Sequence, residues 1–418
     1  MISLPAFRWR LPCCAVVCLL GTSVLLGGCG GGGDQTITLW EQMDPEEREI
    51  LHVLVAEYQA AHPGTRVEVA HYNTEDVRTQ FQTAALGGGG PDLVFGPSDQ
   101  VGPFSVMKLI HPIDEIFPAD ELARFRPEAF DTLDGHVWAL PDQLGNHLTL
   151  LYNQDLIDAA PATMAEFLAA AEAATLDADG DGTPERYGLV FDVSEPFWLI
   201  PFLTGYGGWV IDAAGRPTLA SPAMVRALEL LSSLRNEHGV IPRECDYELA
   251  DTMFKEGRAA MIINGPWSLS AYRKAGIPFA ITRIPWIEET GRWPGPMISS
   301  KGYSVSERVK GEHLARVLDF LRFVTSTESQ IEFATRLGTL PTRRAAYDDV
   351  RIAGDPVLSA SIAQVEVGRR MPVVVEMRAI WDAMRPAVQS VWNGALTPAA
   401  AAQEMQDRAI KKIAEMRQ

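Results

Sequence analysis

Uninterrupted apolar runs and helically spaced apolar positions divide most of this chain between strands and helices. The clearest run, residues 259–263, has no polar alternation, which predicts a strand buried on both faces, as in a parallel sheet covered by helices. Asn264 and Gly265 end this run, and Pro266 suits the first position of a following helix. Trp267 therefore follows the carboxyl end of a buried strand, where open α/β sheets bind ligands. Packing of this ring into the core is the alternative.

The first folded segment has a β-α-β pattern. Residues 36–40 and 66–69 have strand character, and apolar residues at helical spacing between positions 50 and 58 predict a helix between them. Asp44 is suited to cap this helix, with Pro45 at its first position. Loop 41–44 then lies at the carboxyl end of the first strand.

Acidic residues follow two further predicted strands. Asp99 follows the strand at 93–95, and Asp192 and Glu195 follow the apolar run at 189–191. Because ligand-binding loops gather at the carboxyl ends of strands, these acids are expected at the same edge as Asp44. A pure capping role for Asp44 and a solvated loop position for Glu195 are the alternatives.

The rest of the chain has the length and patterning of a two-domain protein. Helices are predicted at residues 76–86, 225–235, 314–324 and 398–416, and a strand at 301–305. The segment 286–296 is rich in Trp, Pro and Gly, which predicts a loop. The 418 residues fit two domains of about 150–200 residues each.

The N-terminal residues have the features of an export signal. Arg8 and Arg10 precede an apolar run, and the small residues Gly27 and Gly28 precede Cys29, which resembles a bacterial lipobox. This resemblance implies a signal peptide over residues 1–28, lipid on Cys29 and a glycine-rich tether over 29–34. A plain signal peptide or an uncleaved anchor is the alternative.

Charge and cysteine content exclude several classes of protein. The chain has 36 basic and 54 acidic residues and a net charge of −18, which argues against binding to nucleic acid or to anionic lipid through a basic face. Beyond Cys29 the sequence contains only Cys245, so no disulfide is possible in the exported chain. We find no cysteine or histidine spacing typical of a zinc site.

One stretch has half of a calcium-loop pattern. Asp177, Asp179 and Asp181 occupy positions 1, 3 and 5, but Gly188 stands where the loop needs a bidentate glutamate. A solvated acidic turn is favoured over a calcium site, and no other cofactor is predicted.

Six stretches, in order along the chain, resemble the solute-binding proteins of sugar ABC importers, nearest the maltodextrin-binding branch. They are GGPDLVF (89–95), LYNQDLI (151–157), SEPFWLIPFLTGYGGW (194–209), FKEGRAAMIINGPW (254–267), TLPTRRAAY (339–347) and MPVVVEMRAIWDAM (371–384). The resemblance implies an α/β fold of the type II periplasmic-binding-protein kind, with two lobes joined by a multi-strand hinge. The N-terminal lobe would comprise residues 35–143 and 302–339, and the C-terminal lobe residues 144–301 and 340–418. The hinge strands are expected near 144–148, 298–302 and 340–342.

The resemblance also assigns residues to a ligand-binding cleft. Trp267 and Trp381 match two aromatic platforms that stack on sugar rings. Glu195 and Phe197 match the glutamate and the aromatic of the family's Glu-Pro-aromatic motif. The further matched or neighbouring ligand-binding positions are Gln42, Asp44, Asp99, Gln100, Asn146 and Arg385. Trp381 has helical spacing with Met377 and Met384, so a position in the core is its alternative.

Three positions differ from the family pattern. Gln100 stands where that branch often has arginine, Gly96 replaces an expected tryptophan, and Asn146 stands near an expected glutamate. These departures affect the identity of the ligand more than its class.

Acids beside indole rings suit a carbohydrate. A carboxylate accepts hydrogen bonds from hydroxyl groups, and an indole face covers the apolar C–H side of a sugar ring. A polyamine is an alternative ligand, because acids and aromatic rings also bind cations. A surface glycoside hydrolase is the alternative from another class, although no pair of acids here has a local setting that would keep one carboxyl protonated.

The sequence therefore predicts a binding protein and not an enzyme. We expect an exported, lipid-anchored monomer that captures maltose, a maltodextrin or a related mono- or oligosaccharide for the permease subunits of an ABC importer. Lipid on Cys29 would be its attachment to the cell membrane, and no nucleic-acid partner is expected.

Overall fold

The computed structural model describes residues 36–416 of the chain. The predicted signal peptide (1–28), the predicted lipidation site Cys29 and the predicted glycine-rich tether (29–34) lie outside the described residues.

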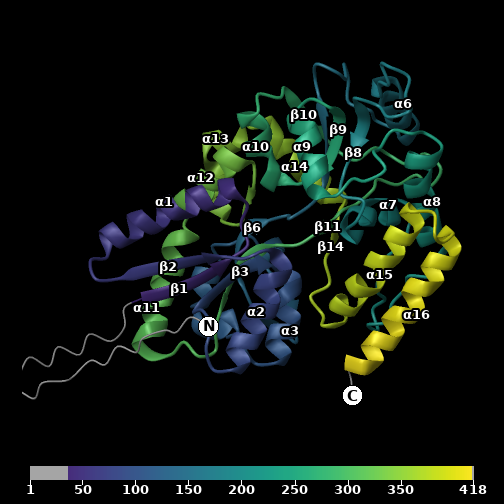
Figure 1. Cartoon of the computed structure of the whole chain (residues 1–418). Helices are drawn as coiled ribbons and strands as arrows, with labels where there is room; N and C mark the ends of the chain where they lie inside the picture. Colours follow the sequence, from purple (N-terminus) through teal and green to yellow (C-terminus); the bar gives the residue numbers. More distant parts are fainter. Residues whose placement is uncertain (1–35, 417–418) are drawn as a thin grey trace, which may run out of the picture. The chain divides into compact units, whose positions relative to one another are not determined.

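A six-stranded mixed sheet forms the centre of what we call the first lobe (Figure 1). In spatial order its strands are β13 (Leu340–Pro341), β6 (Leu140–Leu144), β12 (Lys301–Val305), β3 (Leu93–Pro97), β1 (Thr36–Glu41) and β2 (Arg66–His71). Strand β1 pairs in parallel with β2 and β3, and β12 runs antiparallel to both β3 and β6. The strands predicted at 36–40, 66–69, 93–95 and 301–305 are confirmed.

Helices of the first lobe pack on this sheet through their predicted apolar faces. In α1 (Pro45–Ala61) the buried residues include Ile50, Leu54 and Tyr58, which join Ile37 and Leu39 of β1 in one cluster. Asp44 is the N-cap of α1, as predicted, and its backbone N–H donates to the Glu47 carboxylate at 3.1 Å. The other helices associated with this lobe are α2 (Thr74–Leu86), α3 (Val101–Val106), α4 (Ile113–Ile116), α5 (Ala119–Leu122), α11 (Gly311–Val324) and α12 (Thr327–Leu337).

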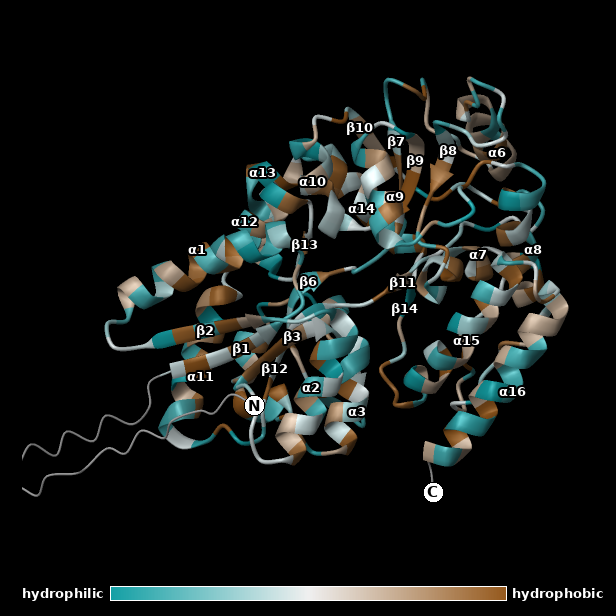
Figure 2. Cartoon of the chain, in the orientation of Figure 1, coloured by the Kyte–Doolittle hydropathy of each residue, from teal (hydrophilic) through white to brown (hydrophobic). Residues whose placement is uncertain are grey.

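A four-stranded sheet forms the centre of the second lobe. Its order is β10 (Phe279–Thr282), β7 (Thr149–Asn153), β9 (Ala259–Asn264) and β8 (Tyr187–Val190). All six residues of β9 are buried, which confirms the prediction for residues 259–263. The expected parallel setting is only half right, because β9 is parallel to β8 and antiparallel to β7. In Figure 2 these inner strands are mostly brown, whereas helices such as α16 alternate between brown and teal.

Helices cover the second sheet, and the last two pack side by side. Helix α15 (Glu376–Trp392) contains the predicted site residues Trp381 and Arg385, and α16 (Pro398–Met416) has the predicted bounds. The others are α6 (Met164–Ala174), α7 (Ile200–Gly205), α8 (Pro222–Asn236), α9 (Tyr247–Lys255), α10 (Leu269–Lys274) and α14 (Pro356–Val367). The short α13 (Val350–Ala353) packs on α12 instead. Helices predicted at 225–235 and 314–324 are confirmed within α8 and α11.

Short elements complete the structure. Two-stranded pairings join β4 (Thr132–Leu133) to β5 (His136–Val137) and β11 (Met297–Ile298) to β14 (Arg369–Arg370). The 3₁₀ helices are η1 (Ser98–Gln100), η2 (Pro127–Ala129), η3 (Pro196–Leu199), η4 (Pro266–Ser268) and η5 (Arg344–Asp348). Pro266 begins η4, as its position after β9 predicts.

The chain crosses repeatedly between the two sheets. It leaves the first sheet after β6 to form β7 of the second, and it returns in β12. The lobe boundaries drawn from the sequence stay a prediction. Four strand residues differ from them, because Leu144, Lys301, Leu340 and Pro341 were assigned to the C-terminal lobe but pair within the first sheet. Among residues 36–416, no helix has both the length and the apolar character that a membrane-spanning segment needs.

Candidate functional site

A cleft of about 570 Å³ is lined by residues of both lobes. From the first lobe it receives Gln42, Asp44, Arg48, His71, Glu75, Arg78 and Asp99. The returning strand β12 contributes Lys301 to the lining. The second lobe contributes Asn146, Asp192, Glu195, Phe197, Tyr247, Trp267, Trp381 and Arg385. The structure thus brings all predicted binding residues except Gln100 to one cleft.

Aromatic residues of the second lobe form one side of this cleft. Trp267 lies in η4, directly after β9, and is half-buried, with its indole N–H donating to the Tyr247 hydroxyl at 3.1 Å. Phe197 is a half-buried residue of η3. Trp381 is only 8% exposed and belongs to the apolar core of the second lobe as well as to the cleft lining. Trp381 therefore combines the two roles that the sequence left open.

Glu195 is held in an ion pair with Arg385. The guanidinium Nε lies 2.6 Å from one carboxylate oxygen, and a terminal nitrogen lies 3.0 Å from the other. Pro196 at the start of η3 places Glu195 at the cleft, and α15 places Arg385 opposite it. Bidentate geometry of this kind fixes the orientation of both groups.

Asp99 is also paired with an arginine, within the first lobe, but through a single guanidinium nitrogen. One terminal nitrogen of Arg78 lies 2.6 Å and 2.7 Å from the two carboxylate oxygens, and Asp99 is 8% exposed. The sequence assigned hydroxyl contacts to Asp99 without this arginine. A ligand hydroxyl would therefore meet an ion pair and not a lone carboxylate.

Asp44 has an unusual ionisation. Burial raises the pKa of its carboxyl to about 7, with a further contribution from the negative charge of Glu47, while Lys301 opposes the shift. The Lys301 ammonium lies 3.4 Å from a Glu47 carboxylate oxygen. The sequence indicated no acid with a setting that would hold a proton, so this is a correction, and its cause is burial that local patterning does not reveal.

The amides of Gln42 and Gln100 explain the glycine at position 96. A Cβ on Gly96 would lie 2.6–2.7 Å from amide atoms of these two glutamines, so they occupy the space beside residue 96. Gln42 lines the cleft, but Gln100 is buried beneath it, and within residues 36–416 its amide has no hydrogen-bond partner. Asn146 lines the cleft and donates to the Ser299 hydroxyl at 3.2 Å.

Several cleft residues were not predicted. They lie on helices and strands, and the sequence pattern of such an element shows which face is apolar but not which residues its polar face contacts. These residues are Arg48, His71, Arg78, Tyr247 and Lys301. The position of Lys301 in a predicted hinge segment was the one sequence signal for this group.

In the acidic loop of the second lobe, the three carboxylate groups that lie close together are not the three that the sequence predicted. Carboxylate oxygens of Asp177, Asp179 and Glu185 lie within 4.8 Å of one another, and all three residues are exposed. Asp181 is absent from this group and instead accepts the Thr183 backbone N–H at 2.7 Å. The solvated acidic turn stays the favoured interpretation and a calcium site its alternative, because exposed acids also gather around turns without an ion.

Comparisons with known proteins agree with this geometry. The family model for bacterial extracellular solute-binding proteins matches residues 53–360. A maltotriose-binding protein of Pyrococcus abyssi is 27% identical over 370 residues, which cover 87% of this chain and 78% of that protein.

Solved structures agree as well. The maltose/maltodextrin-binding domain of Bdellovibrio bacteriovorus bound to maltotriose is 40% identical, with a TM-score of 0.88 over 90% of this chain and 99% of that domain. A Thermus thermophilus maltotriose-binding protein bound to maltotriose is 25% identical, with a TM-score of 0.82 over 90% of this chain and 100% of that chain. The predicted two-lobed fold is confirmed. The matched family comprises binding proteins and not hydrolases, and this chain belongs to the bacterial extracellular solute-binding proteins.

Proposed function

We propose that this protein captures short maltodextrins, with maltotriose as the favoured ligand, and delivers them to an ABC importer. The observation that carries the proposal is the convergence of Trp267, Phe197 and Trp381 with two carboxylate–guanidinium pairs on one cleft. The 40% identity to a domain solved with maltotriose supports this choice of sugar.

The ionic state of the cleft favours a neutral ligand with many hydroxyl groups. Asp99 and Glu195 each have an arginine partner, so neither offers a lone negative charge to a cation. Each guanidinium has five N–H donors, and each carboxylate can accept several hydrogen bonds, so the pairs retain capacity for sugar hydroxyls. A polyamine would compete with the arginines for these acids.

Calorimetric titration of the purified protein with maltose, maltotriose, trehalose and sucrose tests the proposal. A disaccharide is expected to bind with a dissociation constant of order 1–10 μM, from about 0.3 kcal/mol per non-hydrogen atom. Maltotriose is expected to bind more tightly than maltose. A thermal-shift series with spermidine is the control, because a stabilising effect of spermidine without one of maltotriose would assign the cleft to cations.

Binding is proposed to favour the closed arrangement of the lobes, which the permease subunits recognise. Small-angle scattering tests this step, since the radius of gyration should fall at saturating maltotriose. An unchanged radius would contradict closure.

Attachment to the membrane is proposed to depend on lipid at Cys29, since the chain has −18 net charge and little attraction to anionic lipid. The variant Cys29→Ser should be absent from the membrane fraction, and its affinity for maltotriose should equal that of the wild type. Retention of the variant on membranes would contradict the anchor.

A further inference from the structure

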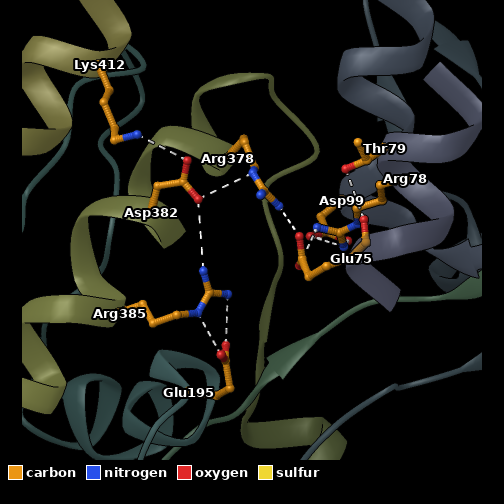
Figure 3. Close-up of polar contacts among 9 residues, drawn as sticks. All are labelled: Glu75, Arg78, Thr79, Asp99, Glu195, Arg378, Asp382, Arg385 and Lys412. Carbon is orange, nitrogen blue, oxygen red and sulfur yellow. Dashed lines mark hydrogen bonds and ion pairs between the residues drawn. The ribbon is translucent and has the colours of Figure 1, made fainter. Parts of the chain in front are cut away.

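An ion pair joins the two lobes away from the aromatic side of the cleft. Arg378 of α15, in the second lobe, contacts the carboxylate of Glu75 on α2, in the first lobe (Figure 3). The two residues are 303 positions apart in the chain. Glu75 lines the cleft, whereas Arg378 lies behind its lining. We call this contact the inter-lobe ion pair.

In the first lobe the inter-lobe ion pair continues to Asp99. The other oxygen of Glu75 lies 3.4 Å from Arg78, which holds Asp99 through the two short contacts described above. The two positive neighbours of Glu75 lower the pKa of its carboxyl against the effect of burial, so it carries its negative charge at neutral pH.

In the second lobe the inter-lobe ion pair continues to Glu195. Asp382 lies 3.4 Å from the Nε of Arg378 and 3.9 Å from a terminal nitrogen of Arg385, and Arg385 holds Glu195. Figure 3 shows these residues as an unbroken series, which Lys412 extends through Asp382 at 3.3 Å. Asp99 and Glu195, which line the cleft from opposite lobes, are therefore connected through the inter-lobe ion pair.

The backbone before α15 also contacts the first lobe. Val373 is buried in the cluster of Val77, Phe81 and Phe104, and a Cβ on Gly102 would clash with the Val373 carbonyl oxygen. The segment that leads into α15 is thus packed against the first lobe five residues before Arg378. This packing places the guanidinium within reach of Glu75.

We propose that Arg378 and Glu75 are positioning residues for ligand retention: their ion pair holds the lobes together around the ligand and slows its release. This inference rests on the proposed capture function. The side chains are 41% and 48% exposed, so a single neutral substitution should have a small effect. Reversal of the charge by Arg378→Glu adds repulsion, because the introduced carboxylate would face both Glu75 and Asp382.

The experiment compares Arg378→Glu, Glu75→Arg and the double exchange by stopped-flow tryptophan fluorescence with maltotriose. Each single variant should raise the dissociation rate about threefold to tenfold, with little change in the association rate. The double exchange should lower the rate below that of either single variant without reaching the wild-type rate. It re-forms the pair with reversed polarity, but it leaves position 75 beside Arg78 and position 378 beside Asp382 with like charges. High salt should raise the dissociation rate of the wild type more than that of Arg378→Glu.

A matched control lies within one lobe. Arg226 and Glu289 form an exposed arginine–glutamate pair, 45% and 54% exposed, and both belong to the second lobe. The variant Arg226→Glu should leave the dissociation rate unchanged. An Arg378→Glu rate equal to that of the wild type, or a faster rate that the double exchange does not lower, would overturn the inference.

Scattering without ligand separates the two proposals. The ligand-free Arg378→Glu variant should have a larger radius of gyration than the ligand-free wild type, and the double exchange should reduce the increase. If the wild type does not bind maltotriose, the capture proposal fails, and the ligand-free radii alone decide on the inter-lobe ion pair. Equal radii in that case would overturn it.

Discussion

The ammonium group of Lys301 lies 5.4 Å from the centre of the Trp267 ring. Lys301 begins β12, the strand that returns from the second lobe to the first sheet, and Trp267 follows β9 of the second sheet. A cation at this distance over an indole face is attracted to the ring. The Trp267 ring is thus in contact with a strand that joins the lobes. Its position therefore depends on β12 as well as on the packing of the second lobe.

Replacement of Trp267 by alanine should weaken maltotriose binding by about 1–3 kcal/mol, because the variant loses ring stacking over the sugar. The fold should persist, since the ring is half-buried and lies at the cleft and not within the core. Calorimetric titration gives the affinity, and urea unfolding gives the stability.

Trp392 supplies the control for this variant. It is 5% exposed in the core of the second lobe and does not line the cleft, and its indole N–H donates to the Arg243 carbonyl at 2.7 Å. Trp392→Ala should lower the free energy of unfolding by about 3–5 kcal/mol. If Trp267→Ala unfolds the protein to the same extent, its role is structural.

Glu195 and Arg385 should act as a unit in binding. A double-mutant cycle with Glu195→Gln and Arg385→Met should give a coupling of about 0.5–3 kcal/mol in maltotriose affinity, because either change releases the partner from its fixed orientation. Calorimetry on the wild type, both single variants and the double variant measures it. Additive losses would mean that the two groups contact the sugar independently.

Maltotriose affinity should depend on pH through Asp44. Since burial raises the pKa of this carboxyl to about 7, it is largely protonated at pH 5.5 and ionised at pH 8.5. The ionised form accepts stronger hydrogen bonds from hydroxyl groups, so affinity should rise with pH over this range. Titrations at both pH values check this, and Asp44→Asn should remove the dependence. Tighter binding at the lower pH would contradict the prediction.

Asp142 should make the fold less stable as pH rises. Both its oxygens are buried without a hydrogen-bond partner among residues 36–416, and burial, aided by the charge of Glu47, raises the pKa of this carboxyl to about 7. In the unfolded chain an aspartate ionises near pH 4, so between about pH 4 and 7 the folded state binds more protons. The stability present below pH 4 is therefore lost as pH rises through 7.

The variant Asp142→Asn isolates this effect. The difference in unfolding free energy between pH 5 and pH 8 should be smaller in Asp142→Asn than in the wild type by about 2–4 kcal/mol. Urea denaturation at the two pH values measures it. Parallel pH profiles for the two proteins would show that Asp142 ionises normally in the folded state.

Local patterning was sufficient for most of the elements, and the family resemblance supplied most of the binding residues. The apolar run at 259–263 is β9, Asp44 caps α1, and residues after strands, such as Asp99 and Glu195, do reach one cleft. These features depend on short spacings: alternation, helical period and the end of a strand. The exception, Gln100, is one residue from Asp99, which shows that a neighbour in sequence can lie on the buried side of the same turn.

The sequence by itself determined the classes of element, because these are encoded in residue types within a few positions of one another. The two-lobed architecture and the carboxylates and rings of the cleft came from its resemblance to a known family. Only the tertiary structure decided the ionic partners, since Arg385 and Glu195 are 190 positions apart and Arg378 and Glu75 are 303 apart. It also decided the ionisation of Asp44 and Asp142, because a pKa responds to burial and to charges that approach through space.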